Sequence, residues 1–196
     1  GARSGASLFA TLLAGFSNVL GRLAGQGSVV IGIPAAGQAA AGHVALVGHC
    51  VNTLPLRFDL DPARSFADEL EAAQAVLFDA LEHQRCTFGT LLKKLPIRRD
   101  PSRMPLISVL FNIDQAADGE KDAFPGLELE FFDNPRSYDA FELFVNAAQI
   151  RGGGLRLECQ YNTDLFDEST VRRWLAAYET LLRAAVAAPG SPGDEG

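Results

Sequence analysis

The sequence predicts an α/β fold, a two-layer sandwich in which helices pack against a mixed β-sheet. Segments with helical and with strand-like spacing alternate through the first half of the chain, and strand-like segments gather in the second half. This arrangement is typical of helices layered on one sheet. With 196 residues, 47% of them hydrophobic, the chain is long enough for one domain with its own core.

The first three predicted elements follow from apolar spacing. Apolar residues on one helical face predict a helix over residues 7–23. A β-branched run over residues 28–33 predicts a strand buried on both faces and ended by Pro34. After an alanine-rich loop over residues 37–42, alternating apolar residues predict a second strand over residues 51–60.

Two helices follow the second strand. Ser65 precedes an apolar stripe and is predicted to cap a helix over residues 66–81. Asp68 stands three positions later, where a complete capping box prefers the longer Glu or Gln. A shorter helix is predicted over residues 88–95, before Pro96.

The second half predicts strands and one closing helix. The strands cover residues 106–113, 127–132, 139–150 and 155–161. Three consecutive glycines, residues 152–154, suit a tight reversal because glycine reaches positive φ without a Cβ clash. Asp167 is predicted to cap the last helix, with a hydrophobic staple between Phe166 and Val171. Residues 189–196 have linker composition, so the folded unit is predicted to be residues 1–188.

Charge and hydropathy exclude several classes of partner. The net charge of −7 argues against a nucleic-acid surface, which needs clustered Lys and Arg. The apolar stretch near the start is interrupted by polar residues, so no membrane span or secretory signal is expected. The densest basic run is predicted to be a solvated loop, with docking of an acidic carrier protein as its functional alternative; it comprises Lys93, Lys94, Arg98, Arg99 and Arg103.

The cysteines and histidines do not predict a catalytic or metal site. Cys50, Cys86 and Cys159 are far apart and are expected to be reduced core thiols of a cytoplasmic protein. The three histidines are His43, His49 and His83, and no two are adjacent. His83 ends an amphipathic helix, where a cation interacts favourably with the helix dipole, and this role is preferred to that of a general base.

Five ordered segments carry the functional signal. Residues 47–57 read Val-Gly-His-Cys-Val-Asn-Thr-Leu-Pro-Leu-Arg, and residues 99–106 read Arg-Asp-Pro-Ser-Arg-Met-Pro-Leu. Residues 32–38 read Gly-Ile-Pro-Ala-Ala-Gly-Gln, residues 83–89 read His-Gln-Arg-Cys-Thr-Phe-Gly, and residues 161–166 read Tyr-Asn-Thr-Asp-Leu-Phe. In their order along the chain and in their spacing, these segments resemble the condensation domains of nonribosomal peptide synthetases.

The resemblance implies one half of a two-part fold. It covers nearly the whole chain and is similar to the C-terminal subdomain, a chloramphenicol acetyltransferase-like half-domain. The family joins carrier-bound aminoacyl groups through a His-His-x-x-x-Asp-Gly loop in its other half, and this chain contains no such loop. The chain departs from the family pattern at Gln38, Cys50, Gly89 and Met104.

The site residues follow from the resemblance together with elementary chemistry. Asn52 and Thr53 either line the family's substrate tunnel or staple the strand through backbone hydrogen bonds. Arg57 is expected to form a structural ion pair in preference to a substrate contact. In the motif Arg99, Asp100, Ser102 and Arg103, the last two are expected to close a turn. No catalytic, metal or directly bound cofactor residue is predicted.

Three functional hypotheses remain open. The chain is a truncated, non-catalytic condensation domain that acts as a platform for an adenylation domain or a peptidyl carrier protein. Alternatively, it forms peptide bonds once joined to a histidine-bearing N-terminal half, using substrates on the phosphopantetheine arms of carriers. A third hypothesis is a scaffold that self-associates through the apolar face that the other half would cover.

Overall fold

A computed structural model describes residues 5–40, 42, 45–98, 100–114, 126–127, 137–150 and 152–190. Among these residues the elements follow in the order α1 (Leu8–Ala24), β1 (Ser28–Ala36), α2 (Gly37–Ala40), β2 (Val51–Asp59), α3 (Phe66–Glu82), α4 (Phe88–Lys94), β3 (Val109–Asp114), β4 (Leu143–Gln149), β5 (Leu155–Tyr161) and α5 (Glu168–Ala187). The predicted α/β fold is confirmed.

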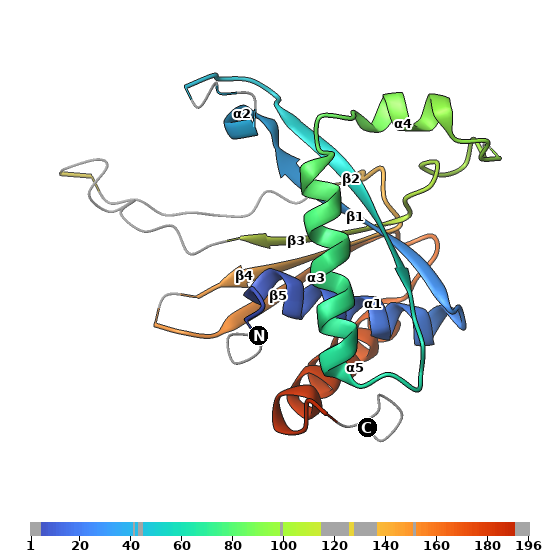
Figure 1. Cartoon of the computed structure of the whole chain (residues 1–196), viewed down its shortest axis with the longest axis vertical. Helices are drawn as coiled ribbons and strands as arrows, with labels where there is room; N and C mark the ends of the chain where they lie inside the picture. The colour runs from blue at the N-terminus through green and yellow to red at the C-terminus, as the bar shows by residue number, and fades with distance from the viewer. Residues whose placement is uncertain are drawn as a thin grey trace.

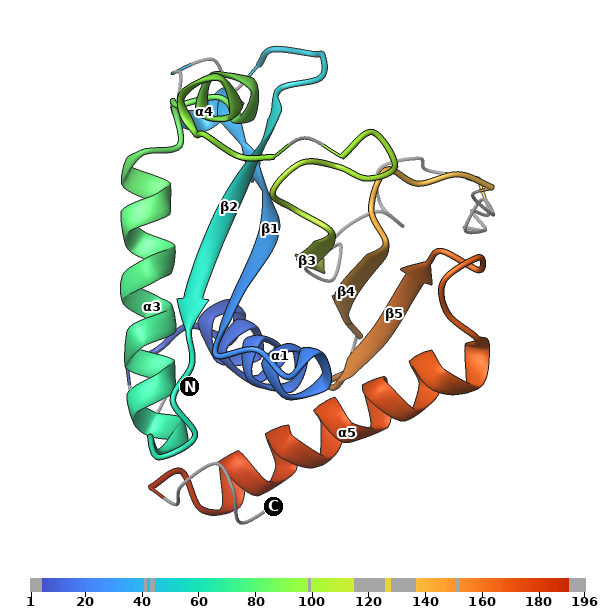
Figure 2. The same cartoon turned by 90° about the vertical axis from the view of Figure 1, so that its right-hand side faces the viewer.

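One mixed sheet organises the molecule. Its five strands lie in the order β2-β1-β3-β4-β5 (Figure 1). The two outer pairs, β1 with β2 and β4 with β5, are antiparallel, whereas the two inner pairs, β1 with β3 and β3 with β4, are parallel. Figure 2 shows the three long helices α1, α3 and α5 on the same side of this sheet, which gives the predicted two layers.

The core lies between the sheet and these helices. Phe16 of α1 stacks on Phe111 of β3 at a ring-centroid distance of 5.2 Å and meets Tyr178 of α5 edge-on at 5.7 Å. The buried Tyr178 hydroxyl donates a 2.7 Å hydrogen bond to the Leu12 carbonyl oxygen. Alternate residues of β1, such as Ile31 and Ile33, face the same layer and are almost fully buried. The sheet therefore presents one apolar face to the helices, as strand alternation requires.

Helix ends follow the predicted capping chemistry only in part. Ser65 and Asp68 form a complete capping box, because Asp68 Oδ2 reaches back to the Ser65 backbone N–H at 3.2 Å. At α5 the cap is Asp167, as predicted, but its side chain makes no capping hydrogen bond. Phe166 makes its ring contact with Trp174, 5.0 Å between centroids, one turn beyond the predicted staple partner Val171.

The first strand is longer than predicted. β1 continues through Pro34 to Ala36, and Pro34 pairs with Thr53 of β2. The opposite edge of β1 pairs with β3 only at Ile31 and Gly32. Beyond those two residues that edge has no described partner strand, so the missing proline N–H is tolerated there. Residues 37–40, predicted to be loop, form the short helix α2.

Two later strands begin after their predicted starts. β3 begins at Val109 because a tight turn holds the preceding residues, with Ile107 N–H bonded to the Pro105 carbonyl at 2.8 Å. β4 begins at Leu143 because Asp139 Oδ1 accepts from the Phe141 N–H and holds that segment in a turn. The predicted strand over residues 127–132 lies outside the described residues apart from Leu127.

The hairpin and the C-terminal end match the prediction closely. Gly152, Gly153 and Gly154 all have positive φ, between 87° and 103°. The helix α5 ends at Ala187, one residue before the predicted limit. The Pro189 carbonyl accepts a 3.0 Å hydrogen bond from the Ala67 N–H at the start of α3, so the first residue of the predicted tail contacts the fold. Residues 191–196 lie outside the described part.

Candidate functional site

Asn52 ties β2 to the corner between α3 and α4. Its Nδ2 donates to the Gln84 and Cys86 carbonyls, both at 3.0 Å, and its Oδ1 accepts from the Phe88 N–H at 3.1 Å. These bonds engage both Nδ2 protons and Oδ1 with backbone groups, which favours the staple alternative. Asn52 and Thr53 are both half-buried, but Thr53 makes no side-chain hydrogen bond among the described residues.

Arg57 forms the predicted ion pair, but at the surface. Its Nη2 lies 2.9 Å from Asp59 Oδ1, and both side chains are more than two-thirds exposed. The Arg57 Nε also donates to Ser28 Oγ at 3.2 Å. The Ser28 hydroxyl and the Arg57 guanidinium lower the pKa of Asp59. The ion pair lies within β2, and the hydrogen bond from Arg57 to Ser28 connects it to the start of β1.

The segment after α4 forms the predicted turn, but the side chain that bonds to its backbone is that of Asp100, not that of Ser102 or Arg103. Asp100 Oδ1 accepts from the Ser102 backbone N–H at 2.9 Å and from the Ser102 hydroxyl at 2.6 Å, and these bonds lower the pKa of Asp100. Arg103 Nε lies 3.2 Å from Asp100 Oδ2, and its Nη1 lies 3.6 Å from Glu142 Oε1. Arg103 thus connects the turn to the start of β4. Arg99 lies outside the described residues.

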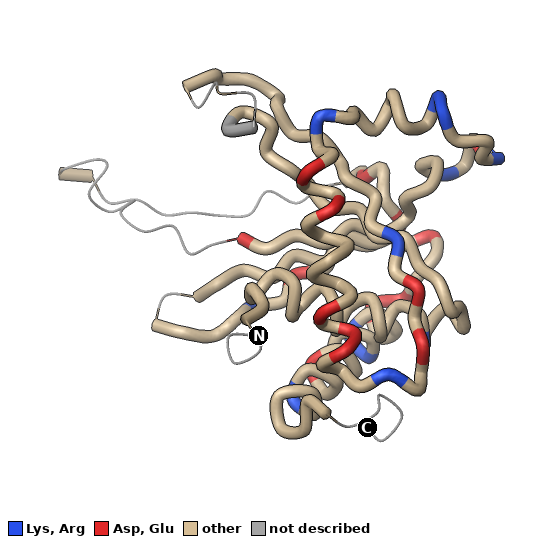
Figure 3. Tube along the Cα trace, viewed as in Figure 1, with Lys and Arg blue, Asp and Glu red and all other residues tan. Residues whose placement is uncertain are grey.

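The basic residues before this turn are exposed, but not all of them are in a loop. Lys93 and Lys94 form the last turn of α4, and Arg98 follows. Figure 3 shows positive charge at this end of α4, whereas α3 carries acidic residues along its length. Lys93 and Lys94 lie in the helix that was predicted over residues 88–95, so the predicted loop applies only to the described part of the basic run after Lys94.

The described histidines and cysteines are scattered. His83 is the C-cap of α3, and its Nδ1 lies 2.8 Å from the Asp79 carbonyl oxygen. This contact, together with the Asp79 carboxylate, raises the pKa of His83. His49 is exposed, and His43 lies outside the described residues. All three cysteines are free. Cys159 is half-buried and packs against the core, as predicted, whereas Cys50 is half-buried outside the core cluster and Cys86 is exposed, which corrects the prediction for these two.

A row of polar side chains crosses the sheet face opposite the helices, and the sequence analysis missed it. Asn112 Nδ2 donates to Asn146 Oδ1 at 3.0 Å, and Asn146 Nδ2 donates to Asp114 Oδ2 at 2.8 Å and to Glu158 Oε2 at 3.1 Å. Asn146 is only 9% exposed. Polar residues alternate with Phe111, Val145 and Cys159, but only the strand register aligns them in one row.

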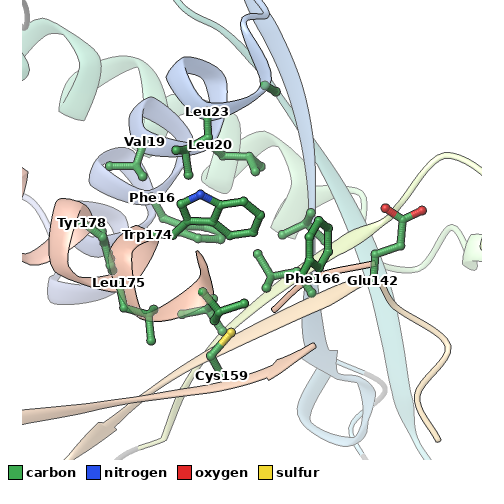
Figure 4. Close-up of a pocket in the computed structure, with 15 residues that line it drawn as sticks. Phe16, Val19, Leu20, Leu23, Glu142, Cys159, Phe166, Trp174, Leu175 and Tyr178 are labelled. Atoms are coloured by element: carbon green, nitrogen blue, oxygen red, sulfur yellow. The ribbon is translucent and has the colours of Figure 1, made fainter. Parts of the chain in front are cut away.

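A cavity of about 310 Å³ lies in the helical layer, between α1, α5 and strands β3 to β5 (Figure 4). Its lining is almost wholly apolar and includes Trp174 and Phe166 of the α5 corner and Leu20 of α1. Of the five motif segments, only Phe166 contributes to this lining.

The described residues contain no group of His, Cys, Asp and Glu side chains that could hold a metal ion. Their helices include none with the length and apolar character of a membrane span.

Comparisons with known proteins agree on one family. A family model described as "Condensation domain" matches residues 2–195. Tyrocidine synthase 3 of Brevibacillus parabrevis is 35% identical over 188 residues, which are 96% of this chain and 3% of that protein. The chain spans between 2% and 7% of the length of the eight curated relatives compared.

Solved structures match the whole described fold. The condensation domain of the monacolin K polyketide synthase superposes with a TM-score of 0.85 at 20% identity, covering 97% of this chain and 44% of that one. A four-domain nonribosomal peptide synthetase bound to AMP and glycine gives a TM-score of 0.86 at 23% identity, covering 97% and 16%. The predicted half-domain fold, that of chloramphenicol acetyltransferase-like proteins, is therefore confirmed.

Proposed function

Because the chain belongs to the condensation-domain family over residues 2–195, we propose that it acts as the C-terminal half of such a domain and forms no amide bond by itself. In a synthetase it would serve as a platform beside an adenylation domain and a peptidyl carrier protein. The proposal concerns this half alone.

The histidine geometry is the observation that carries the proposal. Attack of an amine on a thioester needs a group that orients the amine or accepts its proton. Of the two described histidines, His83 lies against its own helix at Asp79, and His49 stands exposed before β2. Neither lines the cavity, and neither is hydrogen-bonded to Asn112 or Asn146 of the polar row. The placement of these two histidines supports a half-domain that takes its catalytic imidazole from elsewhere.

Charge supports the platform role. Lys93, Lys94 and Arg98 form an exposed basic group at the end of α4. An acidic partner would be steered to such a patch, and the attraction would weaken with salt. We therefore propose this patch as the contact for a carrier protein, whose phosphopantetheine arm carries the thioester in the intact family domain. Such contact requires no catalysis by this chain.

The complementation alternative has its own support. The chain covers 44% of the solved condensation domain of the monacolin K synthase, close to one half. The sheet face opposite the helices carries Asn112, Asn146 and Glu158 in a connected row with Asn146 nearly buried. A polar row of this kind suits a wall that another half completes. In that case the second half brings the paired histidines.

The test compares two preparations with the same pair of aminoacyl carriers. The chain alone is expected to give no dipeptidyl carrier above the uncatalysed rate, as measured by mass spectrometry of the intact carriers. Product from the chain alone would overturn the proposal.

The second preparation adds an N-terminal half that bears the histidine pair. Product from that mixture, lost when the second histidine is changed to Ala, would establish complementation.

Carrier docking is tested separately from amide formation. The triple variant Lys93→Glu, Lys94→Glu, Arg98→Glu is expected to weaken binding of a holo-carrier about tenfold or more, measured by titration at low salt. A matched control reverses three exposed arginines on α5, which are Arg172, Arg173 and Arg183. Equal loss in both triple variant and control would mean a general charge effect and would contradict a specific docking patch.

A further inference from the structure

The cavity between α1 and α5 has the size of a small-molecule site. Its 310 Å³ is at the lower end of the range of ligand pockets. If a water-sized group takes about 30 Å³, the space holds roughly ten heavy atoms. At the mouth, Leu23 is 45% exposed and Ala24 is exposed, so the cavity opens to solvent at the end of α1.

Each ionisable group at the cavity is either neutral or already paired, so none of them would bind a charged ligand. The Tyr178 hydroxyl already donates to the Leu12 carbonyl oxygen. Burial raises the pKa of the Cys159 thiol to about 11, so the thiol is neutral. Glu142 Oε1 accepts from Ser108 and faces Arg103, and Figure 4 shows its carboxylate at the edge of the group, beyond Phe166 and away from Trp174. An ion inside the cavity would be desolvated without a partner.

One polar group in the cavity remains available. Trp174 lies in the middle of the lining side chains, beside Phe166 and opposite Leu20 and Leu23 of α1 (Figure 4). Its indole Nε1–H is a donor, and within the described part of the chain no acceptor is hydrogen-bonded to it. A ligand carbonyl at this point would add one directional bond to an otherwise apolar contact.

We infer that this cavity binds an uncharged, medium-chain molecule whose carbonyl oxygen accepts a hydrogen bond from Trp174 Nε1, as a simple alkyl ester would. The apolar chain lies against the side chains of β3 to β5 and α1. The site is separate from the polar row on the other face of the sheet, which Asn112 and Asn146 form. The inference does not depend on whether the chain takes part in amide formation.

Fluorescence provides a direct test because Trp174 is the only tryptophan in the chain. Methyl octanoate is the probe, titrated against the whole 196-residue chain. We expect a saturable change in tryptophan emission, with octanoate and octylammonium binding about tenfold more weakly or worse. Equal binding of the charged probes, or no saturable change with the ester, would overturn the inference.

A variant at the mouth locates the ligand. Ala24→Phe places a ring at the exposed end of α1 and is expected to weaken methyl octanoate binding about tenfold. The matched control is Ala75→Phe, also at an exposed alanine of a helix, but on α3 and outside the cavity lining. Unchanged affinity in Ala24→Phe, or equal loss in both variants, would place the ligand elsewhere and contradict the inference.

The hydrogen bond is tested through the nearby thiol. In a Cys50→Ser, Cys86→Ser background, Cys159 is the single thiol, and its alkylation by N-ethylmaleimide should slow as methyl octanoate fills the cavity. Trp174→Phe keeps an aromatic ring but removes the donor. It is expected to raise the ester concentration needed for protection by roughly threefold to tenfold. No protection by the ester, or no change with Trp174→Phe, would contradict the assigned contact.

Discussion

At the scale of single residues, Asn52 shows how a motif residue can act through the backbone. Its amide holds Gln84, Cys86 and Phe88 together and so joins β2 to the start of α4. Both Nδ2 protons and one lone pair of Oδ1 are used in these bonds. The motif position therefore has a structural reason to be asparagine.

We predict that Asn52→Ala lowers the free energy of unfolding by about 1 to 3 kcal/mol, because partly buried backbone groups lose their partners. Urea unfolding followed by circular dichroism measures the change. The neighbouring variant Thr53→Val is the control and should change stability by less than about 0.5 kcal/mol, since Thr53 makes no side-chain bond among the described residues. Equal effects of the two variants would contradict the staple role.

Leu106 has a backbone conformation that is unfavourable for leucine. Its φ is 68°, and it is the central residue of the Pro105–Ile107 turn that sends the fully buried Ile107 over Gly32. We predict that Leu106→Gly is more stable than Leu106→Ala by about 1 kcal/mol, the reverse of the usual order, because only glycine is unstrained there. Thermal unfolding of the two variants gives the comparison directly, since both lose the same side-chain contacts beyond Cβ.

Glu69 is a buried carboxylate, 6% exposed, near the start of α3. Burial raises its pKa above 4.5, despite a hydrogen bond from the Asp61 backbone N–H and the charge of Arg64. The folded state then binds the proton more tightly than the unfolded state, so stability falls as pH rises from about 4.5 through the folded pKa.

We predict that Glu69→Gln removes this fall. Urea unfolding of both proteins between pH 4 and pH 7, roughly the interval that brackets this titration, should show the wild type losing stability relative to the variant as the pH increases. The two proteins differ only at residue 69, so the difference curve isolates Glu69. A flat difference curve would show that Glu69 has the same pKa in the two states.

At the scale of elements, α3 and α5 begin with different caps. Ser65 and Asp68 exchange hydrogen bonds at the start of α3, whereas Asp167 makes no side-chain cap bond at α5. Both positions look alike as sequence signals for an N-cap. Only the local geometry determines which side chain satisfies the free N–H groups.

We predict that Ser65→Ala lowers the free energy of unfolding by about 1 kcal/mol, because the Asp68 N–H loses its acceptor. Asp167→Ala, the matched variant at the other helix, should cost less than half as much, since it removes only a favourable charge near the helix start. Equal losses in chemical unfolding would mean that Asp167 caps α5 in solution.

At the scale of the whole molecule, the two ends of the chain are packed together. The Tyr178 hydroxyl of α5 bonds to Leu12 of α1, 166 positions away in the sequence, and Phe16 contacts both Phe111 and Tyr178. The first and last helices therefore share one core with the central strand β3. Unfolding is expected to be cooperative over the described fold.

We predict that Tyr178→Phe lowers the free energy of unfolding by about 1 kcal/mol while the transition remains a single step. Tyr161→Phe is the control, because the Tyr161 hydroxyl has no hydrogen bond among the described residues. Far-ultraviolet circular dichroism and Trp174 emission should report the same midpoint in each variant. Separate midpoints would indicate that α5 unfolds independently of the sheet.

Periodicity and local chemistry were sufficient for most of the fold. The spacing of apolar residues predicted α1, α3 and α5 to within one or two residues, and the glycines at 152–154 predicted the hairpin. A turn at Ser102 was predicted from residue type alone and is present, although the Asp100 carboxylate closes it. These features depend on residues a few positions apart, whose interactions are the same in any fold that forms the element.

Contacts between segments far apart in the chain could not be predicted from the sequence and were seen only in the tertiary structure. Pro34 remains in a strand because β1 is unpaired on one edge at that point, and Asn112, Asn146 and Glu158 form a row only in the observed register. The cavity beside Trp174 likewise exists only where α1 and α5 meet over the sheet. The sequence by itself determined the family and most of the elements, because both depend on patterns of residues that lie close together in the chain. Pairing register, burial and cavities were decided by packing between residues far apart in the chain.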